Sequence, residues 1–442
     1  MYFGFVKKHK TKLLRNRLEK NLMKRYVLPL LLFFLIPGLA SSQSTDELEY
    51  RKVRVSIIPG LSTNGIDAVN YTARYSLNFL GGYNGGLDGF ELGLININQV
   101  YTRGFQFGAF NASGGLMNGV NVAAFANFSR RSMTGIQLSG LANISEGSLQ
   151  GLQGSFFVNA GYGSVRGLQV AGIGNIARED LQGFQFAGLF NASVDDSQGF
   201  QFAGFGNFNA DRQQGFAFAG VTNLSRDMQG FAFAGALNLT RNMQGFQVSG
   251  LANMAYRVRG AQIGLFNFAH DFEGIPIGLI SYYNNGRHNL DVWMSDAGFQ
   301  NIGLKLGTRD IYNMVSLGFN PFLRDRDVWT LGWTIGTYKP LDEAWENSRY
   351  EGFFRMRDFS IQNVQEGSFS TRLNSIYSFR YLIGRDLTGG FGLYAGPSFN
   401  LLLSREARSN EYAWYSILRG ERGGSDFTLW VGFSIGFQFF GH

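Results

Sequence analysis

The chain has 442 residues, of which 60 are Gly, 15% are aromatic and none is Cys. That length exceeds one ordinary compact domain, the Gly and aromatic content is unusual for a soluble enzyme, and the lack of Cys excludes a disulfide framework. The formal charge is +7, but nine of the 39 Lys and Arg and only one of the 32 Asp and Glu lie in residues 1–42, so the rest of the chain carries −1. A nucleic-acid partner needs a basic surface on the folded part and is therefore not expected.

The first predicted element is an export signal. The string "MKRYVLPLLLFFLIPGLASSQS" begins with two basic residues, continues as an apolar run over 26–39, and places Ala40 and Ser42 at −3 and −1 before Gln43. This is the pattern of a secretory signal peptide. A membrane anchor is the alternative, but the apolar run is shorter than the roughly 20 residues that a spanning helix needs. We therefore expect 1–42 to be an N-terminal extension with a signal peptide, and the mature chain to be exported.

Residues 43–86 are predicted to hold N-terminal strands. The strings "KVRVSIIPGL" and "YSLNFLGGY" are the two candidates. Both could add strands to the sheet predicted in the C-terminal half.

Residues 87–283 repeat one unit in tandem. The unit reads G-F-Q-F-A-G-L-x-N and is followed by a polar link such as "LSRDMQ"; a Gln recurs five or six residues before most of the Asn. Asn121, Ala217 and Ala232 replace that Gln in three units. The repeated Asn, 15 or 16 residues apart with a last step of 14, are Asn96, Asn111, Asn127, Asn143, Asn159, Asn175, Asn191, Asn207, Asn223, Asn238, Asn253 and Asn267. The repeated Gln are Gln106, Gln137, Gln153, Gln169, Gln185, Gln201, Gln247 and Gln262.

Two architectures fit this repeat. In a β-solenoid each unit is one rung, about 4.8 Å from the next, so that Asn stacks on Asn and Gln on Gln. Phe and Leu are then expected to fill the interior, and Gly to supply corners with positive φ. In an antiparallel barrel each unit would be one membrane strand with its turn. The turns of such a barrel face alternate compartments, yet "FSRRSMT", "ISEGSLQ", "IAREDLQ" and "ASVDDSQ" show no alternation. The sequence therefore favours an all-β fold with a solenoid of about 12 rungs of 15–16 residues, and one large barrel is the alternative.

The tandem G-x-Q-x-(A)-G-x-x-N units resemble the leptospiral-type bacterial surface repeat over about 89–281. The flanking strings "PGLSTNG" and "GIPIGLISY" resemble those of Bacteroidetes members. The resemblance implies a location in the cell envelope and carries over no catalytic residue. Ala217 and Ala232 depart from the pattern at the Gln position and weaken any functional role for that Gln.

Residues 284–442 are predicted to form an antiparallel β-barrel. The string "FTLWVGFSIGFQFF" alternates strictly, with Phe427, Phe433 and Phe437 on an apolar face and Thr428 and Gln438 on the other, and it resembles the closing strand of outer-membrane barrel proteins. A span without an apolar run of roughly 20 residues is possible only as a closed barrel; a soluble β-sandwich packed on the end of the solenoid is the alternative. The other strands are predicted at about 288–294, 300–307, 311–319, 328–338, 350–361, 370–384 and 389–404, and the link 405–426 has the character of an extracellular loop.

The sharpest candidate for chemistry is a stripe of acids in the repeat turns. Four carboxylates stand four residues after the Asn of consecutive units: Glu179, Asp195, Asp211 and Asp227. In a solenoid they would line one edge, where they could recruit Ca²⁺ or resemble the acidic ridge of solenoid polysaccharide lyases. Arg residues beside them favour the alternative of salt-bridged turns in water. His270, His288 and His442 are scattered without ligand spacing, so no metal site is predicted.

The sequence as a whole predicts a non-enzymatic, exported protein of the outer membrane or cell surface. The barrel is expected to contact outer-membrane lipid, and the repeats to act as a scaffold or as a binding surface for an envelope protein or a glycan. No catalytic, cofactor-binding or metal residue is predicted. The alternatives are an outer-membrane pore or transport barrel and a carbohydrate-active solenoid enzyme.

Overall fold

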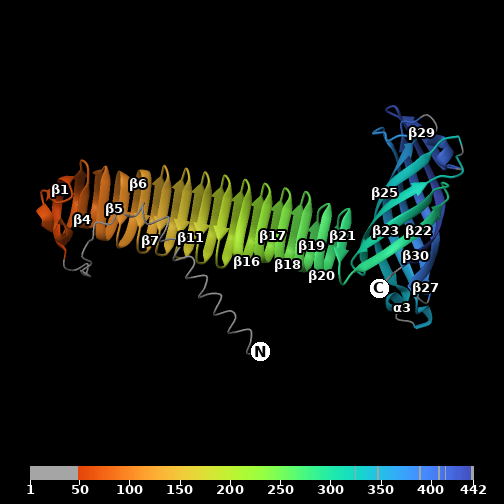
Figure 1. Ribbon diagram of the computed structural model, residues 1–442, viewed down its shortest axis with the longest axis horizontal. Helices are drawn as coiled ribbons and strands as arrows, with labels where there is room; N and C mark the ends of the chain where they lie inside the picture. Colours follow the sequence, from red (N-terminus) through yellow and green to blue (C-terminus); the bar gives the residue numbers. More distant parts are fainter. Residues whose placement is uncertain are drawn as a thin grey trace. The chain divides into compact units, whose positions relative to one another are not determined.

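The computed structural model describes residues 48–439 except Arg324, 346–347, 388–389, 407–408 and Trp414. In this part the chain is all-β, with a β-solenoid of about 13 turns over 72–283 and an eight-stranded antiparallel β-barrel after it (Figure 1). The predicted solenoid is confirmed, and the alternative in which the repeats are strands of one large barrel is wrong. The predicted signal peptide with its cleavage site before Gln43, and His442, lie outside the described residues.

The solenoid contains one 3-10 helix and strands of very different lengths. They are β1 (Glu49–Ile58), β2 (Leu61–Ser62), η2 (Gly65–Asn70), β3 (Tyr71–Asn78), β4 (Gly82–Gly93), β5 (Ile95–Ser113), β6 (Leu116–Ser129), β7 (Met133–Ser139), β8 (Ala142–Ser145), β9 (Leu149–Ser155), β10 (Val158–Gly161), β11 (Val165–Ala171), β12 (Gly174–Ala177), β13 (Leu181–Ala187), β14 (Phe190–Ser193), β15 (Ser197–Ala203), β16 (Gly206–Ala219), β17 (Thr222–Ala234), β18 (Leu237–Ser249), β19 (Ala252–Ile263), β20 (Phe266–Ile277) and β21 (Ile280–Tyr283).

Each turn contributes a long and a short strand segment to two stacks of parallel strands. β13 pairs with β11 and β15, and β14 pairs with β12 and β16, always with the equivalent residue of the next turn. From β16 onward the short segment of one turn runs directly into the long segment of the next. β1, β3 and β4 join the same stack, since β1 pairs with β3, β3 with β4 and β4 with β5, all in parallel. The strands predicted in 43–86 therefore extend the solenoid and not the barrel.

Two ladders of amide side chains run through the solenoid interior. Nδ2 of each repeated Asn donates to Oδ1 of the Asn one turn further on, from Asn78 to Asn267, at 2.8–2.9 Å. The Gln side chains donate in the opposite direction. Nε2 donates to Oε1 of the Gln one turn before in the case of Gln153, Gln169, Gln185 and Gln201. All these side chains are buried. The amides explain the repeat, because an amide side chain can donate to one copy of itself and accept from another.

The glycine two residues after the start of the long segment, Gly183 in β13, cannot be replaced by another residue without strain. Gly183 has φ +140°, and a Cβ there would lie 2.0 Å from the carbonyl oxygen of Gly167, the equivalent residue one turn before. The same conformation recurs along the column from Gly89 to Gly274. It lies within the long strand and not at the corner where the sequence predicted it.

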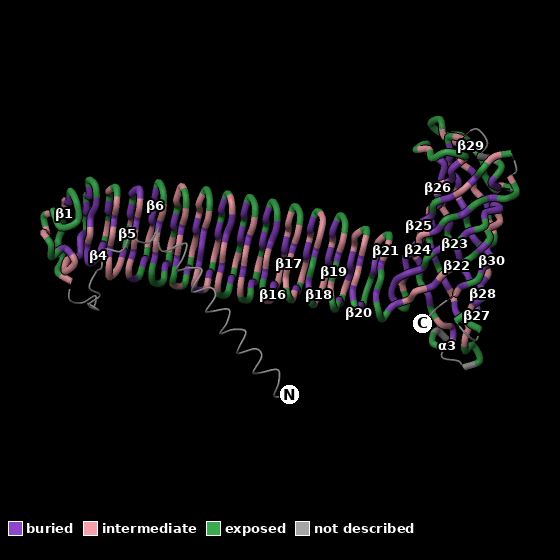
Figure 2. Tube along the Cα trace, in the orientation of Figure 1, coloured by how far each residue is buried: buried purple, intermediate pink, exposed green. Residues whose placement is uncertain are grey.

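The repeated Phe and Leu lie outside the solenoid, so the prediction that they fill its interior is wrong. Gln185 points inward, and strand alternation therefore turns Phe184 and Phe186 outward, where both are exposed. Buried and exposed stretches alternate along the turns of the solenoid (Figure 2). The interior instead combines the amides with small residues and one apolar column, part of which is Met117, Met133, Leu149, Val165 and Leu181.

The two edges of the solenoid differ in character. The edge that joins a long segment to the short segment after it, here named the apolar edge, exposes Leu94, Phe125, Leu141, Phe157, Leu189, Phe205, Val221, Leu251, Leu265 and Leu279. The opposite edge, here named the charged edge, exposes Arg130, Arg131, Glu146, Glu179, Asp180, Asp195, Asp196, Arg212, Arg226, Arg241 and Arg257.

The barrel closes through eight antiparallel strands, and all the predicted strands are found. They are β22 (Arg287–Ser295), β23 (Gln300–Gly307), β24 (Ile311–Phe319), β25 (Val328–Pro340), β26 (Phe353–Glu366), β27 (Asn374–Leu387), β28 (Phe391–Ser404) and β30 (Ser425–Phe439), and β30 returns to pair with β22. Outside this ring lie α3 (Leu341–Trp345), η3 (Ser348–Tyr350), η4 (Ser409–Tyr412) and β29 (Leu418–Arg422), the last of which pairs with β30.

Side chains alternate across the barrel wall, as the sequence predicted. In β30, Phe433 and Phe437 are exposed on the outer surface, whereas Thr428, Ser434 and Gln438 are buried inside. Further around the wall the outer surface is equally apolar: Phe359, Phe379 and Phe399 face one another in register on β26, β27 and β28, and all three are exposed. Among the described residues, no helix is long and apolar enough to cross a membrane.

Candidate functional site

The predicted acidic stripe is broken up by arginines. Asp211 lies 3.5 Å from Nη1 of Arg226, and Arg212 stands opposite Asp227 in the strand register. Glu179 is exposed. The register shifts after Asn209, where the units shorten from 16 to 15 residues, so the acids of later turns no longer stack on those before.

The remaining contacts of the charged edge are exposed or half-buried. Arg212 lies 3.9 Å from Asp196, with both side chains more than half exposed, and Nδ2 of Asn242 donates to Asp227. Exposed pairs of this kind contribute about 0–1 kcal/mol each. The turns therefore match the salt-bridged alternative and not a Ca²⁺ site or an acidic catalytic ridge.

The two described histidines form no metal site. His270 is exposed, stacks on Tyr256 at 4.8 Å and lies 3.2 Å from Asp271. His288 lies against Tyr282, at the start of β22. In the described part of the chain, no group of three or more His, Asp or Glu could hold a metal ion.

The barrel interior holds two buried ion pairs that the sequence did not reveal. Arg380 donates through Nε and Nη2 to the two carboxylate oxygens of Asp358, at 2.8 and 3.1 Å, and the hydroxyl of Tyr312 donates to the same carboxylate at 2.8 Å. Nζ of Lys305 lies 2.5 Å from Asp291. All of these side chains are nearly or fully buried. They stand on five strands, β22, β23, β24, β26 and β27. Each ion pair joins neighbouring strands, and closure of the wall brings Tyr312 of β24 to Asp358 of β26.

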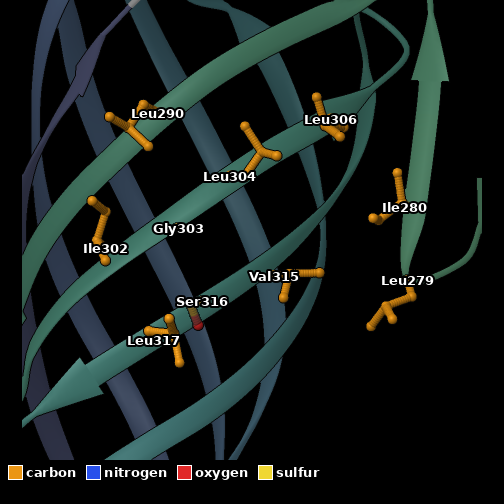
Figure 3. A pocket seen from close by; sticks show the side chains of 10 residues that line it. All are labelled: Leu279, Ile280, Leu290, Ile302, Gly303, Leu304, Leu306, Val315, Ser316 and Leu317. Atoms are coloured by element: carbon orange, nitrogen blue, oxygen red, sulfur yellow. The ribbon is translucent and has the colours of Figure 1, made fainter.

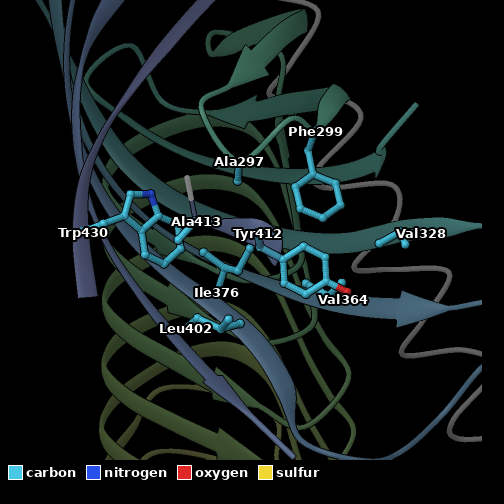
Figure 4. Packing of buried hydrophobic residues seen from close by; sticks show 9 residues of the cluster. All are labelled: Ala297, Phe299, Val328, Val364, Ile376, Leu402, Tyr412, Ala413 and Trp430. Atoms are coloured by element: carbon cyan, nitrogen blue, oxygen red, sulfur yellow. The ribbon is translucent and has the colours of Figure 1, made fainter. Parts of the chain in front are cut away.

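Large side chains fill the space around these charges. Near the ion pairs, one cluster consists of Trp293, Tyr312, Met314, Tyr338, Phe354, Met356, Leu382 and Tyr394. A second cluster, which includes Tyr412 of η4, consists of Ala297, Phe299, Val328, Val364, Ile376, Leu402, Tyr412, Ala413 and Trp430 (Figure 4). A cavity between the two clusters measures about 20 Å³, which is room for one water molecule. This interior is a packed core.

A buried carboxylate lies near the N-terminal end of the solenoid. Glu91 occupies the Gln position of its unit and accepts hydrogen bonds from four side-chain amides, those of Asn78, Asn84, Asn98 and Gln106, at 2.7–3.0 Å. One turn before, Nη1 of Arg54 donates to Oδ1 of Asn78 at 2.8 Å, at the start of the Asn ladder. Burial lowers the pKa of Arg54, and the negative charge of Glu91 opposes that effect. The acid at a Gln position was the one sequence signal for this arrangement.

The last solenoid turn contacts the outer surface of the barrel. Nε1 of Trp333 donates to the carbonyl of Gly278 at 2.8 Å, and Nδ2 of Asn313 donates to the carbonyl of Pro276 at 3.0 Å. Beside these bonds lies an open crevice of about 330 Å³ (Figure 3). Its lining is almost wholly apolar: Leu279, Ile280, Leu290, Ile302, Gly303, Leu304, Leu306, Val315, Ser316 and Leu317.

The molecule therefore offers surfaces, buried polar networks and one apolar crevice. No catalytic, cofactor or metal residue was predicted. Of the four acids in the predicted stripe, Glu179 and Asp195 are exposed, whereas Asp211 and Asp227 are half-buried within β16 and β17. No family model matches the chain, and neither does any curated protein or solved structure.

Proposed function

We propose that this chain is a non-enzymatic protein of the cell envelope, held in an outer membrane by its barrel. The solenoid would serve as a scaffold or as a binding surface for an envelope protein or a glycan. The observation that carries the proposal is the polarity of the barrel wall, which is the opposite of that of a soluble barrel. Exposed Phe359, Phe379 and Phe399 lie outside, and the charged side chains of Asp358 and Arg380 lie inside. A wall of this kind suits a surrounding of lipid, where apolar side chains face the acyl chains and polar ones face the interior.

The strand lengths are in line with that proposal. The eight wall strands have 8 to 15 residues, and a tilted membrane strand needs about 9–11. Closure of β22 on β30 leaves no free edge in the ring, as a wall in lipid requires. The resemblance of the solenoid units to bacterial surface repeats favours the same location.

The packed interior speaks against the alternative of a pore. An eight-stranded barrel is just wide enough for its own side chains, and here they include two ion pairs and a cluster of aromatic residues. The alternative of a carbohydrate-active enzyme loses its main support, because Asp211 lies beside Arg226 and Asp227 lies opposite Arg212.

The test is a charge placed on the outer wall. Phe379→Arg should cost about 2–4 kcal/mol in lipid and should abolish the heat-modifiable band of the protein refolded into vesicles. Phe379→Leu keeps the surface apolar, and Asp310→Arg adds a charge in an exposed turn; both controls should refold normally. If Phe379→Arg instead leaves a monomer that is folded in detergent-free buffer and absent from the membrane fraction, the barrel is a soluble domain and the proposal is wrong.

A further inference from the structure

The outside of the solenoid is apolar on three of its four sides. On the long-segment side, Phe184 and Phe200 stack at 5.4 Å, and the column of rings continues through Phe216, Phe231 and Phe246. On the short-segment side Leu239 and Met254 are exposed, and the apolar edge joins the two sides. The charged edge is polar, and so is the first outward residue of each long segment beside that edge, for example Arg166, Gln182 and Gln198. A monomer in water rarely exposes an apolar patch beyond a few hundred Å², so this surface needs a covering.

The backbone of the apolar edge needs no water. The amide of Leu189 donates to the carbonyl of Ile173 at 3.0 Å, and the amide of Gly188 donates to the carbonyl of Ala171 at 3.1 Å. The equivalent bonds recur in the next turn, where Gly204 donates to Ala187 and Phe205 to Leu189. The charged edge makes bonds of the same kind, for example from the amide of Arg178 to the carbonyl of Gly161 at 2.8 Å. The bonding is common to both edges, and at the apolar edge it meets the requirement of a corner in hydrocarbon, where each unpaired polar group costs several kcal/mol.

The dimensions match one leaflet of a bilayer. From Phe184 to Ala187, where β13 ends, the chain advances three residues, or about 10 Å at roughly 3.3 Å per residue. Gly188 and Leu189 form the corner beyond it, so this apolar stretch fits within one leaflet. Half of a hydrocarbon core of about 30 Å is about 15 Å. The charged edge begins beyond that depth, so it would stand at the headgroups.

The apolar edge is also continuous with the outer wall of the barrel. Leu279 of that edge lines the crevice together with Ile302 and Leu317, which are exposed on the barrel (Figure 3). If the barrel wall is in lipid, the edge that touches it lies in the same layer. A second copy or a protein partner would cover one side, whereas acyl chains cover both sides and the edge between them.

We propose that the solenoid is embedded in one membrane leaflet, with lipid acyl chains covering its apolar edge and both adjoining sides. The charged edge then faces the headgroups and water. This inference deepens the proposed function and rests on the membrane location of the barrel. It assigns the repeats themselves, and not only the barrel, to the lipid layer.

The absence of Cys from the chain allows a direct test. Leu189→Cys and Leu251→Cys place a fluorescent label on the apolar edge, Asp195→Cys places it on the charged edge, and Phe379→Cys places it on the barrel wall. Each full-length variant is refolded into phosphatidylcholine vesicles with brominated acyl chains. The labels at 189 and 251 should lose most of their emission to the bromines and be insensitive to aqueous iodide. The label at 195 should show the reverse.

Each other outcome has one meaning. Quenching at 379 by bromine, with iodide access at 189 and 251, would overturn the embedded solenoid and leave the barrel proposal standing. No bromine quenching at any site would refute both. Protection of 189 and 251 from iodide without bromine quenching would mean that protein, such as a second copy, covers the edge, and would overturn the inference. Heat-modifiable migration of each variant confirms beforehand that the barrel has folded.

Discussion

Nδ2 of Asn191 donates to Oδ1 of Asn207, one turn further on, at 2.9 Å, and neither side chain is accessible to solvent. The same nitrogen donates to the carbonyl of Phe202 at 2.9 Å, so the amide ties the next turn through both its side chain and its backbone. Because Asn175 donates to Asn191 in turn, each amide is held from both neighbours. The ladder fixes the register of the stack residue by residue.

Replacing a ladder amide should therefore destabilise the solenoid. Asn191→Ala leaves Oδ1 of Asn207 without its donor inside a dry core, and each buried polar group left unsatisfied costs about 1–3 kcal/mol. Asn191→Asp should cost more, because a carboxylate would face the carbonyl of Phe202. Urea unfolding followed by circular dichroism measures the change. Asn284→Ala, at an exposed position, is the control, and equal losses at both positions would refute a structural role for the ladder.

Removal of one whole unit should be tolerated. Deleting Gly183–Gln198 brings Asn175 against Asn207 and Gln169 against Gln201, so both ladders close again with one turn fewer. Each turn contacts only its neighbours, and the cost is one interface. Deleting half a unit, Gly183–Phe190, moves every later amide out of its column and should abolish folding. Limited proteolysis should find a resistant core in the first variant and not in the second; equal resistance would contradict the ladder as the source of register.

A methyl group in the glycine column should be costly. Gly183→Ala would force a residue with φ +140° and a Cβ 2.0 Å from the carbonyl of Gly167, and such strain costs about 1–3 kcal/mol or more. Gly154→Ala is the matched control in the same kind of strand, since its Cβ would meet only the flexible end of Leu138. Thermal unfolding should show a lower midpoint for the first variant alone. A similar loss in both variants would contradict close approach at Gly183 as the cause, since the lower chain entropy of Ala in the unfolded state favours folding in both.

The buried ion pair of the barrel should behave as a unit. Asp358→Asn or Arg380→Met leaves one charge without its partner and should cost about 3–5 kcal/mol. The double variant should recover part of that loss, because no lone charge is left inside. Unfolding in urea, arranged as a double-mutant cycle, gives the coupling. Additive losses would mean that the two side chains act independently.

The free energy of unfolding of the barrel should fall as the pH rises, because of the partly buried acid Asp296. This residue follows β22 and accepts a hydrogen bond from Nε1 of Trp430 at 2.7 Å. Burial raises its pKa, although bonds from Trp430 and the Phe433 amide oppose the effect. The folded state thus favours the protonated acid, and this stabilisation is present at acid pH and is lost as the pH rises through the folded-state pKa. Asp296→Asn, which carries no charge, should be more stable than the parent at neutral pH and should remove this part of the pH dependence of unfolding; an unchanged profile would refute the role of Asp296.

The spacing of Asn191, Gln185 and their copies was enough to predict a stack of rungs, since equal spacing is visible in one sequence. The wall strands were equally predictable from their alternation, as in β30. The outward orientation of the repeated Phe side chains could not be predicted, because the usual preference of apolar side chains for the interior led to the opposite expectation. In this solenoid the amide ladders occupy the interior, so Phe184 and Phe186 on either side of Gln185 face outward.

The ion pairs inside the barrel could not be predicted for a different reason. Asp358 and Arg380 lie on neighbouring strands, but Tyr312 is separated from them by many residues, and nothing in the local pattern of a strand says which polar side chains meet in the interior. The Arg54 contact with Asn78 likewise depends on β1 pairing with β3 across an intervening helix. Both the barrel contacts and the Arg54 contact depend on strand pairings between distant parts of the sequence.

The two ends of the ladder have a consequence for assembly. A stack of identical turns is self-complementary from end to end, and its bare ends would join copies head to tail into an open fibre. At one end Arg54 occupies the first Asn acceptor and β1 carries Glu49, Arg51 and Lys52 along its outer edge, charges that discourage a further strand. At the other end Asn267 donates to Ser281, whose hydroxyl also accepts from Asn313 of the barrel. These capped ends prevent copies of the chain from stacking end to end. The repeat, which could otherwise polymerise without limit, therefore forms a solenoid of fixed length.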